Sequence, residues 1–493
     1  MPSNHMQDRT IERIHRYSRL DAICVVVLIA YFLYFALPAR HGGFREDEMM
    51  NLWTYWYVGP VQSLFGLAKF WTPNYRPGGA LYYLPLYHFF GLNPFPYRIV
   101  QISILTLSIP LAYYLTRLLA SSRSVAFLAV LAFCYHPYVA NLVFVGAFIY
   151  DVLCGLFYLA ALTYYVHIRN NNTPLRPLQL LLFLLLYICA LNSKEMAVTL
   201  PVIVLLYELL KLPRWPGWDA LLSWTWRCAA PALIAGVITA IYVYSKIYGS
   251  GSVTRFDAYH PTYSWNNFVT SNTRFVGELL YAPETITPTV LLLLWTVVFI
   301  YAFLRRDRML WLMAFWVVIV PLPIAFLLPI RSGGCLYLLL FGWATIGARA
   351  ACDLIVFVTN RTSPSRVARI GMVSVFAVLL AVFTRWENHR LGTVPNMLAV
   401  GQKVSHVIAA FDSLRLQPAP RSTVLLKPKE QLFQNKWHPL FIASLVWNDH
   451  SLQIGIDKLN KLTPEQIAHV DYIISLTEFE AKVIQSPDMR QAN

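Results

Sequence analysis

The sequence predicts an all-α polytopic membrane protein that carries a small soluble α/β domain at its carboxyl end. Of the 493 residues, 57% are hydrophobic and only 13% are charged, whereas average chains carry about 25% charged residues. Long uncharged stretches alternate with short basic loops, and after Trp386 the pattern becomes that of a soluble protein. These three observations exclude a disordered chain, a fibrous repeat, a disulfide-rich secreted module and an ordinary cytosolic enzyme.

The apolar stretches have the length of membrane-spanning helices. A helix needs about 20 mostly apolar residues to cross a bilayer, and in lipid it satisfies its own backbone hydrogen bonds. Length and polar interruptions together predict about eleven transmembrane helices. In chain order they are Ala22–Ala39, Ile99–Ala120, Ser124–Ala140, Val152–Ile168, Leu178–Leu191, Ala197–Leu210, Ala229–Gly249, Thr289–Leu304, Met309–Ile330, Cys335–Val358 and Ile370–Trp386.

The excess of positive charge predicts how the chain is oriented. It carries 40 Lys and Arg against 25 Asp and Glu, a net charge of +15. Four arginines between Arg9 and Arg19 precede the first span, and with that end in the cytoplasm the basic loops alternate as the positive-inside rule requires. We therefore expect an integral multi-pass protein of a bacterial inner membrane or plasma membrane, with a cytoplasmic N-terminus and no nucleic-acid partner.

Three parts of the chain follow from this orientation. Residues 1–20 are predicted to be a cytoplasmic segment, residues 21–386 the transmembrane domain, and residues 387–493 an extracytoplasmic soluble α/β domain. In that last part, stretches around 397–414 and 464–470 are predicted helices. Short β-like runs occur at Val424–Leu426, Leu452–Ile456 and Tyr472–Ile474.

Three consecutive acids begin the first outer loop, which spans residues 40–98. They are Glu46, Asp47 and Glu48. Adjacent carboxylates repel one another, so that the pKa of at least one is raised and suited to proton abstraction. Their oxygens can also hold a divalent cation, with Asp47 and Glu48 as the candidate ligands. The alternative is a solvated cap, in which the acids oppose the amino-terminal dipole of the next helix.

The rest of this loop predicts two interfacial helices and a turn. Leu52–Gly59 and Val61–Phe70 are rich in aromatic residues, which are suited to the headgroup level. The turn Pro73–Gly79 is punctuated by proline and glycine and presents Arg76. An arginine held there can bind a phosphate bidentately. The alternative is an arginine that extends to the lipid headgroups.

The other outer turns also contribute polar groups. These are His136, Asp151, Lys194, Glu195, Arg331 and Tyr337. Taken singly, each has a simple alternative: Asp151 can cap its helix, and Lys194 with Glu195 can form a local ion pair. Taken together, ionisable groups at every short outer turn predict one site at the outer interface.

Segments between Leu20 and Ala350 also carry a known family pattern. They are Asp47-Glu48, Tyr75-Arg76-Pro77, Phe90-Gly91-Leu92-Asn93-Pro94, Tyr97-Arg98, His136-Pro137, Asp151, Asn192-Ser193-Lys194-Glu195 and Arg331-Ser332-Gly333-Gly334 with Tyr337. In this order they resemble the GT-C superfamily of polytopic glycosyltransferases, and particularly the protein O-mannosyltransferase branch that includes the TMTC-type proteins. The chain departs from that pattern at Asn141, where the family has a glutamate, and it shows no tetratricopeptide periodicity after Trp386.

The resemblance implies an inverting glycosyltransferase that moves a sugar from a polyprenyl-phosphate donor to an extracytoplasmic acceptor. The sugar is a mannose-type or another hexose or pentose, and the acceptor is a glycan, a lipid or a protein. Asp47 is then the general base, with Glu48 as its partner or an acceptor-binding group. The donor phosphate is expected at Arg76, Lys194 and Arg331. The remaining polar contacts are Glu46, His136, Asp151, Glu195 and Tyr337.

Two alternatives come from other classes. A polytopic lipid or glycolipid transporter also has many spans and polar outer turns, but such proteins tend to show repeated halves and charges near the midplane. The sequence shows neither, which favours the transferase. The second alternative is a transferase-like scaffold without catalysis, against which Asp47 and Glu48 argue.

Overall fold

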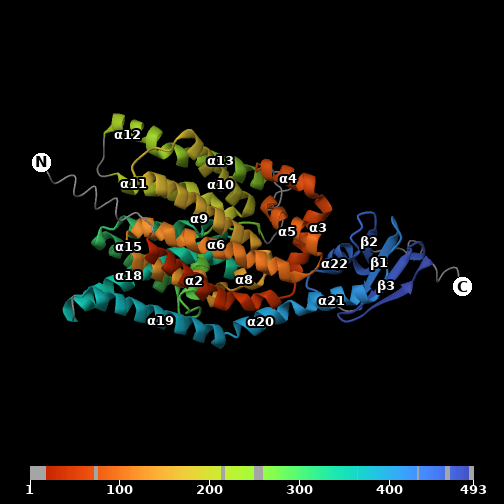
Figure 1. The fold of residues 1–493 in the computed structure, drawn as a ribbon. Coiled ribbons are helices and arrows are strands. Elements are labelled where there is room, and N and C mark those ends of the chain that lie inside the picture. Colours follow the sequence, from red (N-terminus) through yellow and green to blue (C-terminus); the bar gives the residue numbers. More distant parts are fainter. Residues whose placement is uncertain are drawn as a thin grey trace.

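The computed structural model describes residues 18–71, 76–212, 217–248, 259–362, 365–429, 432–460 and 467–487. The predicted cytoplasmic segment 1–20 therefore lies outside the described residues, apart from its last three. The long helices run side by side in one bundle, and a small sheet lies beyond one end of it (Figure 1).

Within the described residues, fourteen α-helices form the bundle. They are α2 (Arg19–Ala36), α6 (Pro94–Ala120), α7 (Arg123–Cys134), α8 (Asn141–Phe144), α9 (Ile149–Asn170), α10 (Pro177–Ser193), α11 (Leu200–Lys211), α12 (Trp218–Trp224), α13 (Ala230–Tyr248), α15 (Pro288–Arg305), α16 (Arg308–Ile319), α17 (Leu322–Ala325), α18 (Tyr337–Thr362) and α19 (Arg366–Arg390). Polar caps set where several of them begin. The Ser18 side chain accepts from the Asp21 amide while the Asp21 carboxylate accepts from the Ser18 amide, and Thr287 and Ser365 cap α15 and α19.

The predicted membrane fold is confirmed, although fewer helices qualify directly as spans. Within the described ranges, eight helices are long and apolar enough to cross a membrane. A ninth candidate is the pair Arg123–Cys134 and Pro137–Phe144, bent by 51° where Pro137 cannot continue the backbone hydrogen bonding. The other two predicted spans are helices of 17 and 12 residues, α10 and α11, which are separated by the Lys194–Glu195 turn.

The first long loop, which was predicted to be an outer loop, folds over the end of the bundle that faces the sheet (Figure 1). It contains α3 (Glu46–Val58), α4 (Pro60–Ala68), a 3-10 turn at Pro77–Gly79 and α5 (Ala80–Phe90). The two predicted interfacial helices correspond to α3 and α4. However, α3 begins six residues earlier than predicted, so that the three acids form its first turn. The second long loop contains α14 (Trp265–Leu279).

The carboxyl-terminal part is a mixed α/β unit. Its strands are β1 (Thr423–Pro428), β2 (Gln453–Ile456), β3 (Tyr472–Leu476) and β4 (Ala481–Gln485), in the order β2-β1-β3-β4. β1 pairs in parallel with β2 and β3, and β4 pairs antiparallel with β3. The helices are α20 (Thr393–Val400), α21 (Gln402–Ser413), α22 (His438–Trp447) and α23 (Asp457–Asn460).

The three predicted β-like runs coincide with β1, β2 and β3, except that Leu452 precedes β2, whereas β4 and α22 were not predicted. α22 supplies the crossover that a parallel β1–β2 pair needs. α19 continues to Arg390, four residues past the predicted end of the transmembrane domain at Trp386, because its helical hydrogen bonding ends only at Leu391.

Candidate active site

A cavity of about 930 Å³ lies where α3 faces the ends of several bundle helices. Its wall includes six of the ten predicted site residues, which come from five different segments of the chain. These six are Asp47, Arg76, Asp151, Lys194, Glu195 and Arg331. Much of the remaining wall is apolar, with valine, isoleucine and leucine side chains from α11, α13, α16 and α17. Such a wall suits a hydrocarbon chain, while the charged groups suit a polar head.

Asp47 is the carboxylate of the acidic triplet that faces the cavity. It lies in the first turn of α3 and is exposed. Among the residues that the structure describes, its carboxylate has no hydrogen-bond or ion-pair partner. An exposed, unpaired carboxylate at the cavity wall is available to accept a proton from a bound molecule.

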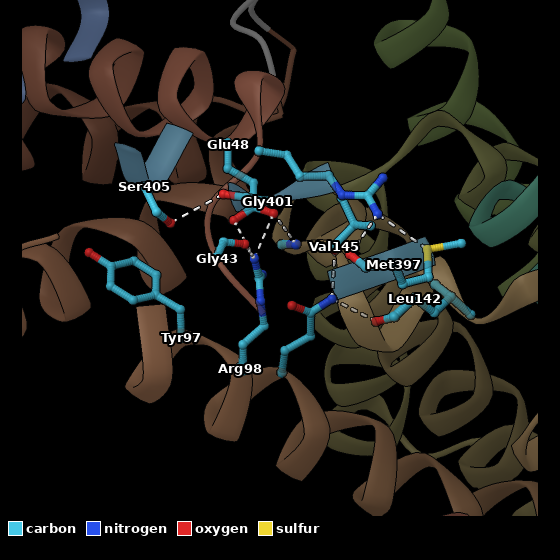
Figure 2. Close-up of polar contacts among 12 residues, drawn as sticks. Gly43, Glu48, Tyr97, Arg98, Leu142, Val145, Met397, Gly401 and Ser405 are labelled. Carbon is cyan, nitrogen blue, oxygen red and sulfur yellow. Dashed lines mark hydrogen bonds and ion pairs between the residues drawn. The ribbon is translucent and has the colours of Figure 1, made fainter. Parts of the chain in front are cut away.

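Glu48 is held in a buried ion pair away from the cavity wall (Figure 2). Nη2 of Arg98 donates to both Glu48 oxygens at 2.9 Å and to the Gly43 carbonyl at 2.6 Å. The Gly146 amide donates to Oε1 of Glu48 at 2.6 Å. Both side chains of the pair are almost fully buried, 0% and 1% exposed. The pair therefore ties α3 to α6, one residue away from Asp47.

The third acid, Glu46, also lies outside the cavity wall. Its Oε2 is 3.8 Å from Nδ1 of His438 in α22. The carboxylates of Glu46, Asp47 and Glu48 thus lie in three different environments. The described residues contain no cluster of three or more histidine, cysteine or acidic side chains placed to hold a metal ion. The arrangement does not fit a divalent cation shared by Asp47 and Glu48.

Arg76 is buried at the cavity wall and paired with Glu195. Nη2 of Arg76 lies 3.0 Å from Oε2 of Glu195, and Nε donates to both carboxylate oxygens at 3.2 Å. Burial opposes ionisation of Glu195, but the guanidinium outweighs it and lowers the pKa of the carboxyl to about 2. Arg76 does not extend to lipid headgroups, which was the alternative. Its backbone has a left-handed conformation, with φ +38°.

Lys194 forms a second buried pair at the same wall. Its Nζ lies 2.5 Å from Oδ1 of Asp151 and 3.3 Å from Sγ of Cys335. Burial by itself lowers the pKa of Lys194, but the Asp151 carboxylate raises it above its ordinary value, so that the ammonium stays charged. Lys194 and Glu195 do not pair with each other, because Lys194 reaches Asp151 in α9 whereas Glu195 reaches Arg76 in the turn before α5. The local ion pair considered for them is therefore wrong.

Arg331 and Arg76 both contact the ring of Tyr259, which was not among the predicted site residues. The Cζ atoms of Arg331 and Arg76 lie 4.8 and 6.0 Å from the centroid of the Tyr259 ring. The segment that follows Tyr259 is tied down by the Thr262 amide, which donates to the Phe326 carbonyl at 2.9 Å. Tyr259 thus holds two guanidinium groups at one part of the cavity through cation–π contacts.

Two other predicted site residues do not line this cavity. His136 is buried, with Nε2 3.2 Å from the Leu279 carbonyl and its ring stacked on Tyr281 at 4.2 Å. Tyr337 is buried and stacks on Phe133 at 4.6 Å. Both side chains pack between helices, so the structure does not bring them to the charged groups.

Sequence reasoning missed several residues of the cavity wall and its support. Lys246 and Tyr259 line the cavity, as does Asn51, one turn after Asp47 in α3. Lys246 was detectable, because it is a charged residue near the end of an apolar span, where charge is costly. Arg98 was noted only as part of a family motif, and nothing in the sequence indicated that its partner is Glu48.

Comparisons with known proteins support the fold. No family model and no curated protein matches the chain. Among solved structures it is similar to ArnT from Cupriavidus metallidurans in the apo state, with a TM-score of 0.50, 14% identity, and coverage of 95% of this chain and 94% of that chain. A second structure of that protein, bound to undecaprenyl phosphate, has a TM-score of 0.48 and 13% identity over 95% and 94% of the two chains. The chain therefore has an ArnT-like fold, and the predicted polytopic helical architecture with a small carboxyl-terminal sheet domain is confirmed.

Proposed function

We propose that the chain is an integral-membrane inverting glycosyltransferase that transfers a sugar from a polyprenyl-phosphate donor to an extracytoplasmic acceptor. The observation that carries the proposal is the composition of one cavity wall. It combines the Asp47 carboxylate, several cationic side chains and a large apolar surface. A base, a phosphate site and a lipid-binding surface are the three parts that this reaction needs, and the ArnT-like GT-C fold supports the same class of reaction.

The cavity carries more positive than negative side chains, which favours a phosphate. Arg76, Lys194, Lys246 and Arg331 line it together with three carboxylates. Glu195 and Asp151 hold Arg76 and Lys194 at the wall through their ion pairs. The donor phosphate then binds where these cations converge, with the guanidinium groups as charge-assisted donors. The prenyl chain extends along the apolar wall.

The proposed reaction is a single displacement at the anomeric carbon. Asp47 accepts the proton of the acceptor hydroxyl while the acceptor oxygen attacks the anomeric carbon. The bond from that carbon to the phosphate oxygen breaks, and the departing phosphate takes the bonding electrons. Arg76, Lys194 and Arg331 stabilise the charge that develops on it. One attack from the face opposite the phosphate inverts the configuration. In this proposal Glu48 does not touch the substrate but positions α3 through Arg98.

Finer features of the proposal rest on the sequence. The order of the motifs supports a TMTC-like O-mannosyltransferase branch and a mannose-type sugar, and the basic loops support a cytoplasmic N-terminus with the cavity opening outward. The acceptor is a glycan, a lipid or a protein.

The direct test is to incubate the purified protein with a panel of polyprenyl-phosphate sugars and to measure released lipid phosphate. Release with at least one donor, lost in Asp47→Asn, is the expected result. Movement of a labelled lipid across vesicles, with no release from any donor, would favour the transporter instead.

A further inference from the structure

The short helix α3 connects the two halves of the proposed site. Asp47 in its first turn faces the cavity. Tyr55, two turns later, donates its hydroxyl hydrogen to the Arg76 carbonyl at 2.8 Å, and its hydroxyl oxygen lies 2.9 Å from that of Tyr150. The position of α3 therefore sets both where Asp47 lies and where the Arg76 turn lies. α3 has only 13 residues and is not a membrane span, so its position depends on what packs against it.

The carboxyl-terminal domain packs against the latter half of α3. Nε1 of Trp56 donates to Oδ1 of Asn448 at 2.7 Å. The Trp56 ring stacks on His450 with centroids 3.8 Å apart and planes 11° from parallel. Trp53 packs on Phe441 of α22, with centroids 4.8 Å apart. These tryptophans were expected to lie at lipid headgroups, but they contact protein.

A second contact holds the start of α3 (Figure 2). Gly43 lies so close to the backbone between α20 and α21 that a Cβ at this position would be 2.6 Å from the Gly401 carbonyl oxygen. Nη2 of Arg45 donates to the Met397 carbonyl at 3.3 Å. The carboxyl-terminal part thus makes contacts on both sides of Asp47. One set involves the residues just before α3, and the other involves the later turns of α3.

We propose that the carboxyl-terminal domain positions the proposed general base by docking on α3, with Asn448 and His450 as positioning residues. The inference rests on the proposed function of Asp47. Docking restrains α3 on the side of the carboxyl-terminal domain, and the Glu48–Arg98 pair restrains it on the side of α6. A misplacement of a catalytic group by about 1 Å can cost on the order of a hundredfold in rate. Loss of the docking contacts is therefore expected to lower kcat, whereas donor binding at the cavity cations is retained.

The test uses the full-length chain with the double variant Asn448→Ala/His450→Ala. Neither residue lines the cavity, so the double variant removes no direct contact with a donor bound there. We expect kcat to fall by about tenfold or more while the donor KM stays within about twofold. Hydrogen exchange of the α3 amides should become faster, while exchange of β1 and β3 stays unchanged, which shows that the domain remains folded. His450→Phe retains the stacked ring and is expected to keep most of the rate.

Ile484→Ala, at an exposed position of β4, is the matched control in the same domain and should change neither kcat nor exchange. An unchanged kcat in the double variant overturns the proposal, as does a rise in donor KM alone. If the unaltered chain turns over no polyprenyl-phosphate sugar, the proposed function fails. In that case the exchange measurement decides separately: faster exchange of α3 supports its ordering by the domain, and unchanged exchange overturns it.

Discussion

Asp47 is the residue on which the proposed reaction depends most directly, because it is the carboxylate of the triplet that faces the cavity. Asp47→Asn keeps the shape of the side chain and removes the base. Transfer is expected to fall by about 10²- to 10⁴-fold, measured as released lipid phosphate, while membrane insertion is unchanged. Asp412→Asn, which alters an exposed acid of α21, is the control. A fully active Asp47→Asn variant would remove Asp47 from the mechanism.

Substitution of Arg331 tests whether the cavity cations bind the donor phosphate. Arg331→Ala removes a charge-assisted donor and its contact with the Tyr259 ring. The KM for the donor should rise about tenfold or more, since a hydrogen bond to a charged group contributes roughly 1.5–3 kcal/mol. The acceptor KM should change much less. Arg305→Ala, in a half-exposed ion pair of the bundle, serves as the control. An equal rise of both KM values would argue against a role at the phosphate.

Glu195 gives a prediction about pH. Its pKa falls from an ordinary value near 4.5 to about 2 in the folded chain. The stabilisation from its pair with Arg76 is therefore complete above about pH 5 and is lost as the pH falls toward 2. Glu195→Gln should melt several degrees below the unaltered chain at pH 7, and this difference should shrink at acid pH. Thermal unfolding in detergent at a series of pH values measures it. A difference that is constant with pH would contradict the ion-pair assignment.

At the scale of elements, one buried ion pair joins α3 to α6. Arg98→Met leaves Glu48 buried without its cation, and breaking such a pair typically costs about 3–5 kcal/mol. The double variant Glu48→Gln/Arg98→Met should recover part of that loss, because no uncompensated charge remains. Arg274→Met, which breaks a more exposed pair in α14, should cost at most about 1 kcal/mol.

Chemical unfolding of the four proteins measures these differences, and transfer assays on the same samples separate the two roles considered for Glu48. If Glu48 only positions α3, the double variant keeps part of its kcat and its acceptor KM. If Glu48 binds the acceptor, the acceptor KM rises wherever Glu48 is changed.

At the scale of the whole molecule, the arrangement of spans decides where the sheet domain lies. If α10 and α11 cross the membrane together with the eight direct spans and the bent pair, the number of crossings is odd. The two ends of the chain then lie on opposite sides. A single cysteine at Phe479, which is 71% exposed, should react with an impermeant reagent added to intact cells. A cysteine at Val367, in a predicted cytoplasmic loop, should react only after permeabilisation. The reverse pattern would overturn the proposed orientation.

The sequence by itself determined the membrane class and most of the charged residues at the cavity wall. The length of an apolar stretch and the cost of charge in lipid are properties of a contiguous segment, so they can be recognised without a fold. For this reason Asp47, Arg76, Lys194 and Arg331 stood out before their positions were known. The same reasoning located β1, β2 and β3, whose short apolar runs are also local.

Only the tertiary structure decided how the polar residues pair. Lys194 reaches Asp151 across 43 residues, Arg76 reaches Glu195 across 119, and Arg98 reaches Glu48 across 50. Pairing over such separations depends on which helices pack together, and sequence spacing does not carry that information. Packing also brought Tyr259 between two arginines and set the carboxyl-terminal domain against α3. Three adjacent acids were indistinguishable in the sequence, but they acquired three different surroundings because successive side chains of a helix point in different directions.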